Sequence, residues 1–163
     1  MQDLITLSNT IKQTLEKQNI RVQSVDLNRP WGGFLVIEEN DAQPFIDTYF
    51  SDINAQAIAG EKVSPKILFV APDKKLSWQY HHRRAEIWKL IEGEAGLVRS
   101  MNDLPGKTEF MKRGEVVTLQ KGERHRLVGT NQWGVVAEIW IHTDPQNPSN
   151  EDDIIRLQDD FGR

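Results

Sequence analysis

The sequence contains no cysteine among its 163 residues. Disulfide bonds, thiolate metal ligands and cysteine nucleophiles are therefore excluded. The absence of cysteine is compatible with a reducing compartment, and we expect a cytoplasmic protein.

The chain also lacks an excess of positive charge and any long apolar run. Its formal net charge of -4 argues against broad binding to nucleic acid. No apolar run approaches the length that crosses a bilayer. Residues 1–4 show neither the basic region nor the continuous apolar run of a signal peptide. We expect one soluble domain with a sizeable core, which binds neither nucleic acid nor membrane.

Four polar side chains carry the strongest chemical signal that is present. Gln79, His81 and Glu86 lie close together in the sequence, and His125 follows at a distance. They offer an amide oxygen, two imidazoles and a carboxylate, which together suit a borderline divalent metal ion. We expect one ion per chain, zinc first, with manganese, iron, cobalt and nickel left open. If Gln79 is not a ligand, the other three form a three-ligand site with open positions.

The spacing of these residues is consistent with strands joined by turns. Gln79 and His81 point to the same side, because side chains alternate along a strand. A turn over residues 82–85 would begin a second strand and bring Glu86 close to the first pair. His125 follows a turn, and a barrel that joins the two strand pairs would complete the site.

Short strands separated by turns dominate the rest of the chain, which favours a sandwich or a barrel. We expect a helix over about residues 4–18, whose apolar stripe packs on the barrel or on a partner subunit. Residues 44–50 fit a short helix or a turn, and residues 149–160 are expected to form a helix. The expected strands are residues 20–25, 34–37, 66–71, 75–81, 86–92, 94–99, 107–112, 115–119, 125–129 and 134–142.

The two segments with the polar set resemble the two motifs of the cupin superfamily. The first motif contains His-x-His, a later Glu and a final Gly. Here Gln79 stands for the first His, while His81, Glu86 and Gly93 fall in register. The second motif contains Gly, a Pro-x-Gly turn, His and Asn. Its matches are Gly114, Gly122 and His125, and its replacements are Gln120 for Pro and Gly129 for Asn.

Four segments carry a closer resemblance, to the type II phosphomannose isomerases, which are also found as the C-terminal domain of mannose-1-phosphate guanylyltransferases. The segments are Arg29-Pro30-Trp31-Gly32, Lys75 to Trp88, Gly122-x-x-His125-Arg126-Leu127 and Glu151 to Arg163. The resemblance spans about residues 28–163. Each segment alone is weak, but four in order are specific.

This resemblance implies an all-β, single-domain cupin jelly-roll barrel over residues 28–163. Residues 1–27 would add the N-terminal helix and a lead-in strand, and we expect a short helical tail. The implied function is a metal-dependent sugar-phosphate aldose–ketose isomerase, most like the conversion of mannose 6-phosphate to fructose 6-phosphate. The implied metal ligands are Gln79, His81, Glu86 and His125.

Arginines are the candidates for holding the phosphate, since a guanidinium group pairs with two phosphate oxygens at once. A surface salt bridge is the alternative for each of them. We expect substrate contacts from Arg84, Arg126, Lys75 and Trp31. We expect catalytic roles for His82, Arg84 and Arg163, with His82 as the candidate general base.

Two positions depart from the family, because its third His is Arg83 and the His after Glu is Ile87. Both changes would alter the pocket without touching the ligands. We expect altered isomerase activity, with Arg83→His raising turnover of mannose 6-phosphate more than Ile87→His. Two alternatives stay open: a different metal-dependent cupin enzyme, or a non-catalytic cupin that binds a sugar or a nucleotide sugar. A homodimer is expected from exposed sheet edges and the apolar stripe of the N-terminal helix.

Overall fold

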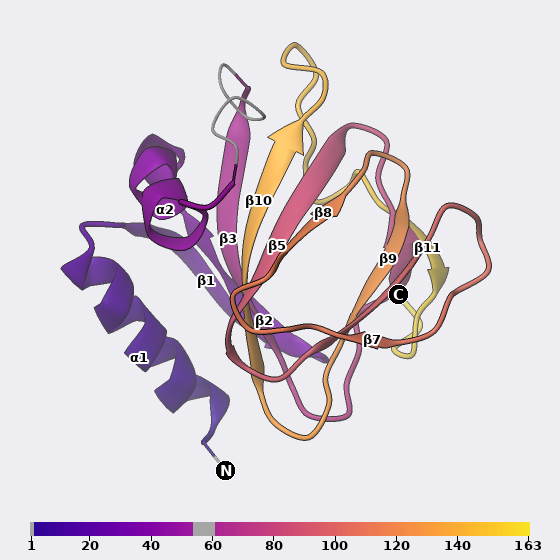
Figure 1. Ribbon diagram of the computed structural model, residues 1–163, viewed down its shortest axis with the longest axis horizontal. Helices are drawn as coiled ribbons and strands as arrows, with labels where there is room; N and C mark the ends of the chain where they lie inside the picture. Colours follow the sequence, from indigo (N-terminus) through magenta and orange to yellow (C-terminus); the bar gives the residue numbers. More distant parts are fainter. Residues whose placement is uncertain (1, 54–60) are drawn as a thin grey trace.

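Two antiparallel sheets face each other and enclose a barrel, with two helices outside one sheet (Figure 1). A computed structural model describes residues 2–53 and 61–163. The six-stranded sheet has the order β1 (Val22–Arg29), β2 (Gly32–Ile37), β3 (Val63–Val70), β10 (Gly134–His142), β5 (Arg84–Gly93) and β8 (Val116–Leu119). The five-stranded sheet has the order β11 (Ile155–Gln158), β4 (Trp78–Tyr80), β9 (Arg124–Val128), β6 (Gly96–Ser100) and β7 (Glu109–Phe110).

The helices α1 (Leu4–Lys17) and α2 (Ala42–Tyr49) lie on the outer side of the six-stranded sheet, and the 3-10 turn η1 (Glu39–Asp41) precedes α2. The carboxylate of Asp3 caps α1 by accepting a backbone N–H of the first turn at 2.8 Å. Leu7, Ile11 and Leu15 are buried along one side of the helix. The helix ends before Asn19, which adopts a left-handed backbone with φ of 58°.

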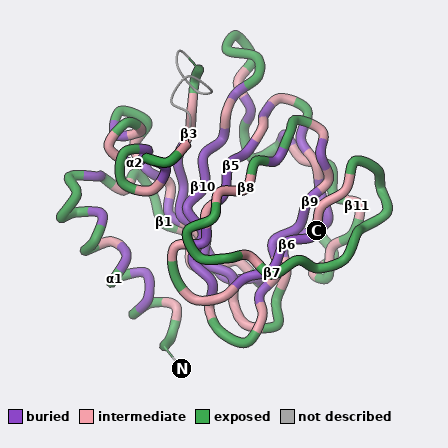
Figure 2. Tube along the Cα trace, in the orientation of Figure 1, coloured by how far each residue is buried: buried purple, intermediate pink, exposed green. Residues whose placement is uncertain are grey.

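Alternation along β3, β5 and β10 gives the six-stranded sheet two different faces. The outer face forms an apolar cluster with the helical region, which includes Ile67, Phe69, Ile87, Val135, Ala137 and Ile139 with Leu7, Ile11, Leu15, Phe45 and Phe50. The inner face contributes Leu68, Val70, Trp88, Leu90 and Val136 to a second cluster inside the barrel. Figure 2 shows that β10 is buried along most of its length, whereas β5 mixes buried and half-buried residues. The inner face also carries buried charged side chains, including Lys66, Glu86 and Glu138.

Gly32 allows β2 to approach β3 closely. Its φ is 145°, and a Cβ atom there would lie 2.0 Å from the carbonyl oxygen of Phe69. A side chain is therefore excluded at this position. The segment Arg29-Pro30-Trp31-Gly32 thus serves as a tight connection between β1 and β2, and it directs Trp31 into the barrel cluster.

The expected all-β barrel with an N-terminal helix is confirmed, and each expected strand overlaps an observed one. The observed β4 and β7 are shorter than expected, and β1 extends further, to Arg29. The segment at residues 44–50 is the helix α2. The boundary expected between residues 27 and 28 falls inside β1, so the lead-in strand is continuous with the six-stranded sheet.

The expected helix over residues 149–160 is wrong, because this segment forms a turn followed by β11. The side chain of Asn150 accepts the N–H of Asp152 at 2.9 Å, and its carbonyl accepts the N–H of Asp153 at 3.1 Å. These local bonds hold a turn in place of a first helical turn. Pairing of β11 with β4 then fixes the rest of the tail. Tertiary pairing has overridden local helix signals.

The apolar stripe of α1 is covered within the chain, since Leu7, Ile11 and Leu15 are each 5% exposed or less. The stripe therefore gives no reason for a partner subunit, and the homodimer stays a prediction. None of the helices in residues 2–53 and 61–163 is long and apolar enough to cross a bilayer.

Candidate metal centre

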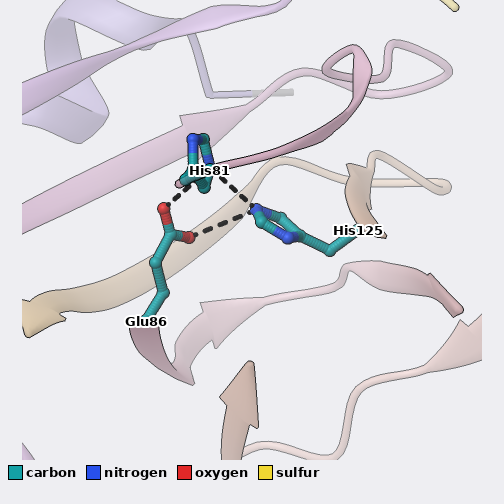
Figure 3. A group of neighbouring side chains, drawn as sticks. All are labelled: His81, Glu86 and His125. Carbon is teal, nitrogen blue, oxygen red and sulfur yellow. Dashed lines mark hydrogen bonds and ion pairs between the residues drawn. The ribbon is translucent and has the colours of Figure 1, made fainter. Parts of the chain in front are cut away.

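Three buried side chains, His81, Glu86 and His125, point toward one another, as Figure 3 shows. His81 follows β4, Glu86 lies in β5 and His125 lies in β9. One ligand atom from each lies within 4.8 Å of the others, and all three residues are buried. His125 lies 39 positions after Glu86 in the sequence, and the two residues meet because the two sheets close into a barrel here.

Hydrogen bonds fix the orientation of both imidazole rings. His81 Nδ1 donates to the carbonyl of Asp153 at 2.7 Å, and His125 Nδ1 donates to the carbonyl of Glu123 at 2.9 Å. A carbonyl oxygen can only accept, so Nδ1 carries the proton in each ring. Each neutral ring then has a lone pair on Nε2, the arrangement that second-shell carbonyls create in metal sites.

These lone pairs converge on the carboxylate of Glu86. His81 Nε2 lies 3.2 Å from Glu86 Oε1, and His125 Nε2 lies 3.4 Å from Glu86 Oε2. The two Nε2 atoms are 3.2 Å apart. Lone pairs and a carboxylate at these distances repel one another unless a proton or a cation lies between them. The donor set therefore fits a divalent metal ion.

Electrostatics at the site favour the metal-binding protonation states. Burial raises the pKa of a carboxyl group, but the positive charge of Arg84, followed by the neighbouring imidazoles of His125 and His81, outweighs burial and holds the pKa of Glu86 well below its usual value. Burial lowers the pKa of His81 against the opposite pull of Glu86. An ionised carboxylate and a neutral imidazole are the forms that coordinate a metal.

Gln79 lies beside this group, because it is the direct cross-strand partner of His125 between β4 and β9. Its Oε1 accepts the hydroxyl of Ser77 at 2.7 Å. An amide oxygen has two lone pairs, so this bond leaves one for a metal. The structure thus places all four expected ligands together, with Gln79 at the edge of the set.

Arg84 reaches into the ligand set itself. Its Nε donates to Glu86 Oε1 at 2.8 Å, and its Nη2 lies 3.2 Å from His81 Nε2. The guanidinium group also lies 3.6 Å above the ring of Trp140. A permanent positive charge therefore already shares the donor atoms, and a bound metal would have to share or displace these contacts.

A cavity inside the barrel adjoins the metal-ligand set through Gln79, Arg84 and Glu86. Four more basic side chains line it: Arg29, Lys66, Arg156 and Arg163. The aromatic lining comes from Trp31, Phe34, Trp88 and Trp140, and the other acids are Glu138 and Glu151. A cavity of this composition suits a polar ligand with an anionic end.

The other expected site residues fall into two groups. Trp31 and Arg163 line the cavity, and Arg163 pairs with Asp159 at 2.9 Å. Arg126 does not line it, because its guanidinium group donates to the main-chain carbonyls of Leu76 and Gln158 at 2.7 and 3.2 Å. Nor do the remaining two candidates. Lys75 faces Asp160 at 3.7 Å, and His82 is exposed with its ring against Tyr80.

Two buried charged residues of the cavity, Glu138 and Lys66, were missed in the sequence, as were the less buried Arg29, Glu151 and Arg156. Glu138 accepts the indole N–H of Trp88 at 2.7 Å and that of Trp140 at 2.9 Å. Burial, followed by the negative charge of Glu86, raises the pKa of Glu138 to about 8. Lys66 is also buried and lies 3.8 Å above the ring of Trp140. For both Glu138 and Lys66, the sequence shows a single charged residue within an apolar strand, and this pattern indicates a buried charge.

Asp153 connects the C-terminal segment to the metal-ligand set. Its carboxylate accepts the backbone N–H groups of His82 and Arg83 at 2.9 and 3.0 Å, and its carbonyl orients His81. The two departures from the family lie outside the cavity lining. Arg83 belongs to this turn, and Ile87 belongs to the outer apolar cluster.

Comparison with known proteins agrees with this geometry. A family model described as mannose-6-phosphate isomerase C-terminal matches residues 53–159. A mannose-1-phosphate guanylyltransferase of Salmonella montevideo is 26% identical over 163 residues, which is all of this chain and 28% of that protein. The alginate biosynthesis protein AlgA of Pseudomonas aeruginosa is 32% identical over 104 residues, which is 64% of this chain and 20% of that protein. The chain spans less than a third of the length of these relatives.

Solved structures with the same fold support the barrel assignment. The capsular polysaccharide assembling protein CapF of Staphylococcus aureus matches with a TM-score of 0.54 at 15% identity, over 83% of this chain and 34% of that chain. The 7S globulin of Momordica charantia also has a TM-score of 0.54, at 16% identity over 81% of this chain and 34% of that chain. These likenesses concern the fold alone, and the expected cupin jelly roll is confirmed.

Proposed function

The chain belongs to the mannose-6-phosphate isomerase C-terminal family, and on this premise we propose that it interconverts an aldose phosphate and a ketose phosphate with one bound divalent metal ion. The proposed reaction is most like that of mannose 6-phosphate and fructose 6-phosphate. One observation supports it above the others. Two fixed imidazole lone pairs and an ionised carboxylate converge at the end of a cavity lined by basic side chains.

The metal would be held by His81, Glu86 and His125, with Gln79 as a fourth ligand. We propose zinc, since a mixed nitrogen and oxygen set of four suits this ion. When bound, the ion supplies positive charge that stabilises the oxygen of an enediolate. The contribution of the chain is to hold the rings in one orientation through the carbonyls of Asp153 and Glu123.

The basic lining of the cavity would hold the phosphate and so orient the sugar. Arg29, Lys66, Arg156 and Arg163 line the cavity, and Arg163 comes from the C-terminal segment. Arg84 lies between the metal ligands and Trp140, so it would contact the sugar near the reacting carbons. These residues replace Arg126 as the proposed phosphate contacts, because the guanidinium group of Arg126 already donates to two main-chain carbonyls.

Metal analysis together with a coupled assay tests this proposal. Purified protein is expected to hold about one divalent ion per chain and to isomerise at least one member of a panel of aldose phosphates. The double variant His81→Ala/His125→Ala is expected to lose both the ion and the turnover. Full metal occupancy in that variant would refute the site assignment. A metal-loaded wild type without turnover of any aldose phosphate would refute the isomerase.

The contacts of Arg84 favour a second candidate function, which is binding of a sugar phosphate without turnover. A guanidinium group at 2.8 Å from Glu86 Oε1 already neutralises the carboxylate without a metal. A protein of this kind would bind sugar phosphates after treatment with a chelator. Calorimetric titration of the chelated protein with mannose 6-phosphate, together with a turnover assay of the metal-loaded protein, separates the two candidates, because only the isomerase converts the sugar phosphate when the ion is bound.

A further inference from the structure

We propose that Glu138 is the acid–base residue that moves the proton between the two reacting carbons of the sugar phosphate. The inference rests on the proposed isomerase function and assigns a group that neither the motifs nor the metal-ligand set contains. It is carried by the position of the Glu138 carboxyl group, which lines the cavity beside the ligand Glu86.

The register of three strands places Glu138 at the cavity wall. On β10 it lies directly opposite Lys66 of β3 and Trp88 of β5. The indole N–H of Trp88 is 2.7 Å from Glu138 Oε2 and 3.1 Å from Glu86 Oε2, so one donor holds both carboxyl groups. A sugar whose oxygens approach the metal-ligand set therefore has its neighbouring carbons next to Glu138.

The partners of Glu138 leave it able to exchange a proton. Both of its hydrogen-bond donors are uncharged indole groups, from Trp88 and Trp140. Neither donor can take up a proton, and neither fixes the carboxyl group in an ion pair. Glu138 is only 4% exposed, so a proton on it is shielded from solvent.

The other acidic and imidazole groups at the cavity are less suited to this role. Glu86 is committed as a ligand and pairs with Arg84. The side chain of Glu151 is 62% exposed and pairs with Lys66. His82 is exposed and does not line the cavity. Among the described residues that line the cavity, Glu138 is the buried carboxyl group that is neither a proposed metal ligand nor part of an ion pair.

The proposed step balances without a further reactant. The ionised Glu138 takes the proton from C2 as the C2–H bond breaks, and the electron pair forms the C1=C2 bond of an enediol while the C1 carbonyl oxygen accepts a proton. The carboxyl group then returns its proton to C1. Loss of the proton from the C2 hydroxyl completes the ketone, so the proton gained by one oxygen is lost by the other.

The ionisation of Glu138 is consistent with this geometry. In the metal-free protein, burial raises the pKa of Glu138 to about 8. The charged groups facing it are Glu86, which raises the pKa, and Lys66 and Arg84, which lower it.

The test compares zinc-loaded wild type with Glu138→Gln and with the control Glu92→Gln, which makes the same change at an exposed position of β5. Three quantities are measured: bound metal, kcat and KM for mannose 6-phosphate, and exchange of the C2 hydrogen with D2O by NMR. Glu138→Gln is expected to retain one ion and a KM within about threefold. Its kcat and C2 exchange are expected to fall by about 10²- to 10⁴-fold, the usual contribution of an acid–base group.

The outcomes separate this inference from the proposed function. A wild type that isomerises, together with a Glu138→Gln variant within tenfold of its kcat, overturns the role of Glu138 and leaves the isomerase standing. A wild type that neither isomerises nor exchanges C2 hydrogen overturns the isomerase itself. If Glu138→Gln does not fold or loses its metal, the variant Glu138→Asp is used for the test. It keeps a carboxyl group but moves it away from the substrate by the length of one methylene group. A kcat equal to wild type in Glu138→Asp overturns the inference, and a loss of tenfold or more at constant KM supports it.

Discussion

The two faces of the six-stranded sheet differ in composition although they share the same strands. On β10 the outer face presents Val135, Ala137 and Ile139 to the helices, whereas the inner face presents Glu138 and Trp140 to the cavity. The same division holds on β5 and β3. The outer face is a continuous apolar cluster, and the inner face combines aromatic rings with buried charges.

This difference indicates a division of roles within each strand. Apolar burial on the outer face contributes free energy of folding. Buried charges on the inner face cost desolvation energy, which their partners only partly offset. The outer face and its helices therefore stabilise the sheet on which the inner face carries chemistry. Substitutions on the two faces should separate stability from metal binding.

The largest effect on stability is expected from Phe45→Ala in α2. Phe45 is fully buried in the outer cluster, and loss of a buried phenyl group costs about 3–5 kcal/mol. Metal content per folded chain should stay unchanged. Chemical denaturation with metal analysis checks both. The control Phe110→Ala, at a residue 76% exposed, should change stability by less than about 0.5 kcal/mol.

A pH-dependent effect is expected at Glu138 in metal-free protein. Its folded pKa of about 8 lies above the usual 4.5, so its contribution to stability is complete below pH 4.5 and is lost as the pH rises through 8. Between these values wild type should lose of the order of 1 kcal/mol per pH unit more than Glu138→Gln. Denaturation curves at pH 5 and pH 8 measure this. Equal slopes for the two proteins would contradict the buried, protonated state.

A smaller loss is expected from Ile87→His, because Ile87 packs in the outer cluster. An imidazole without a hydrogen-bond partner there should cost about 1–3 kcal/mol. Arg83 lies in the half-buried turn that precedes β5, so Arg83→His should cost less stability than Ile87→His. Thermal denaturation shows which of the two variants is the less stable. If Arg83→His destabilises more, the assignment of residue 87 to the structural face is wrong.

The smallest effect is expected at the start of α1. Asp3→Ala removes the capping carboxylate and should cost about 1 kcal/mol. Asp3→Asn retains a capping oxygen and should be nearly neutral. Neither variant should alter metal content, because α1 touches the outer face alone. A loss of metal in Asp3→Ala would show that the two faces are not separable.

Local patterns predicted most of the strands and the residues that gather as candidate metal ligands. Gln79, His81 and Glu86 are near one another in sequence, so strand alternation and one turn suffice to bring them together. His125 could be added because it lies in the second motif. The position of Ile87 on the face opposite Glu86 follows from the same alternation.

Arg84 was expected at the site, but its full set of contacts and the position of Glu138 could not be predicted, because both depend on segments that are distant in the sequence. Glu138 meets the ligand Glu86 only because β10 pairs with β5 in one particular register. Arg84 bonds to Glu86, two positions along β5, and its Nη1 also donates to the hydroxyl of the distant Ser149 at 2.9 Å. The C-terminal turn was missed for a similar reason, since its partners lie on the far segment around His82.

Metal content of four proteins tests the central claim most directly: wild type, His81→Ala/His125→Ala, Phe45→Ala and Glu138→Gln, each equilibrated with zinc and separated from free ion. We predict about one ion per chain in wild type, in Phe45→Ala and in Glu138→Gln, and none in the double histidine variant. An ion retained by the double variant, or lost from Phe45→Ala while that variant is folded, would contradict the assignment of chemistry to the inner face and stability to the outer one.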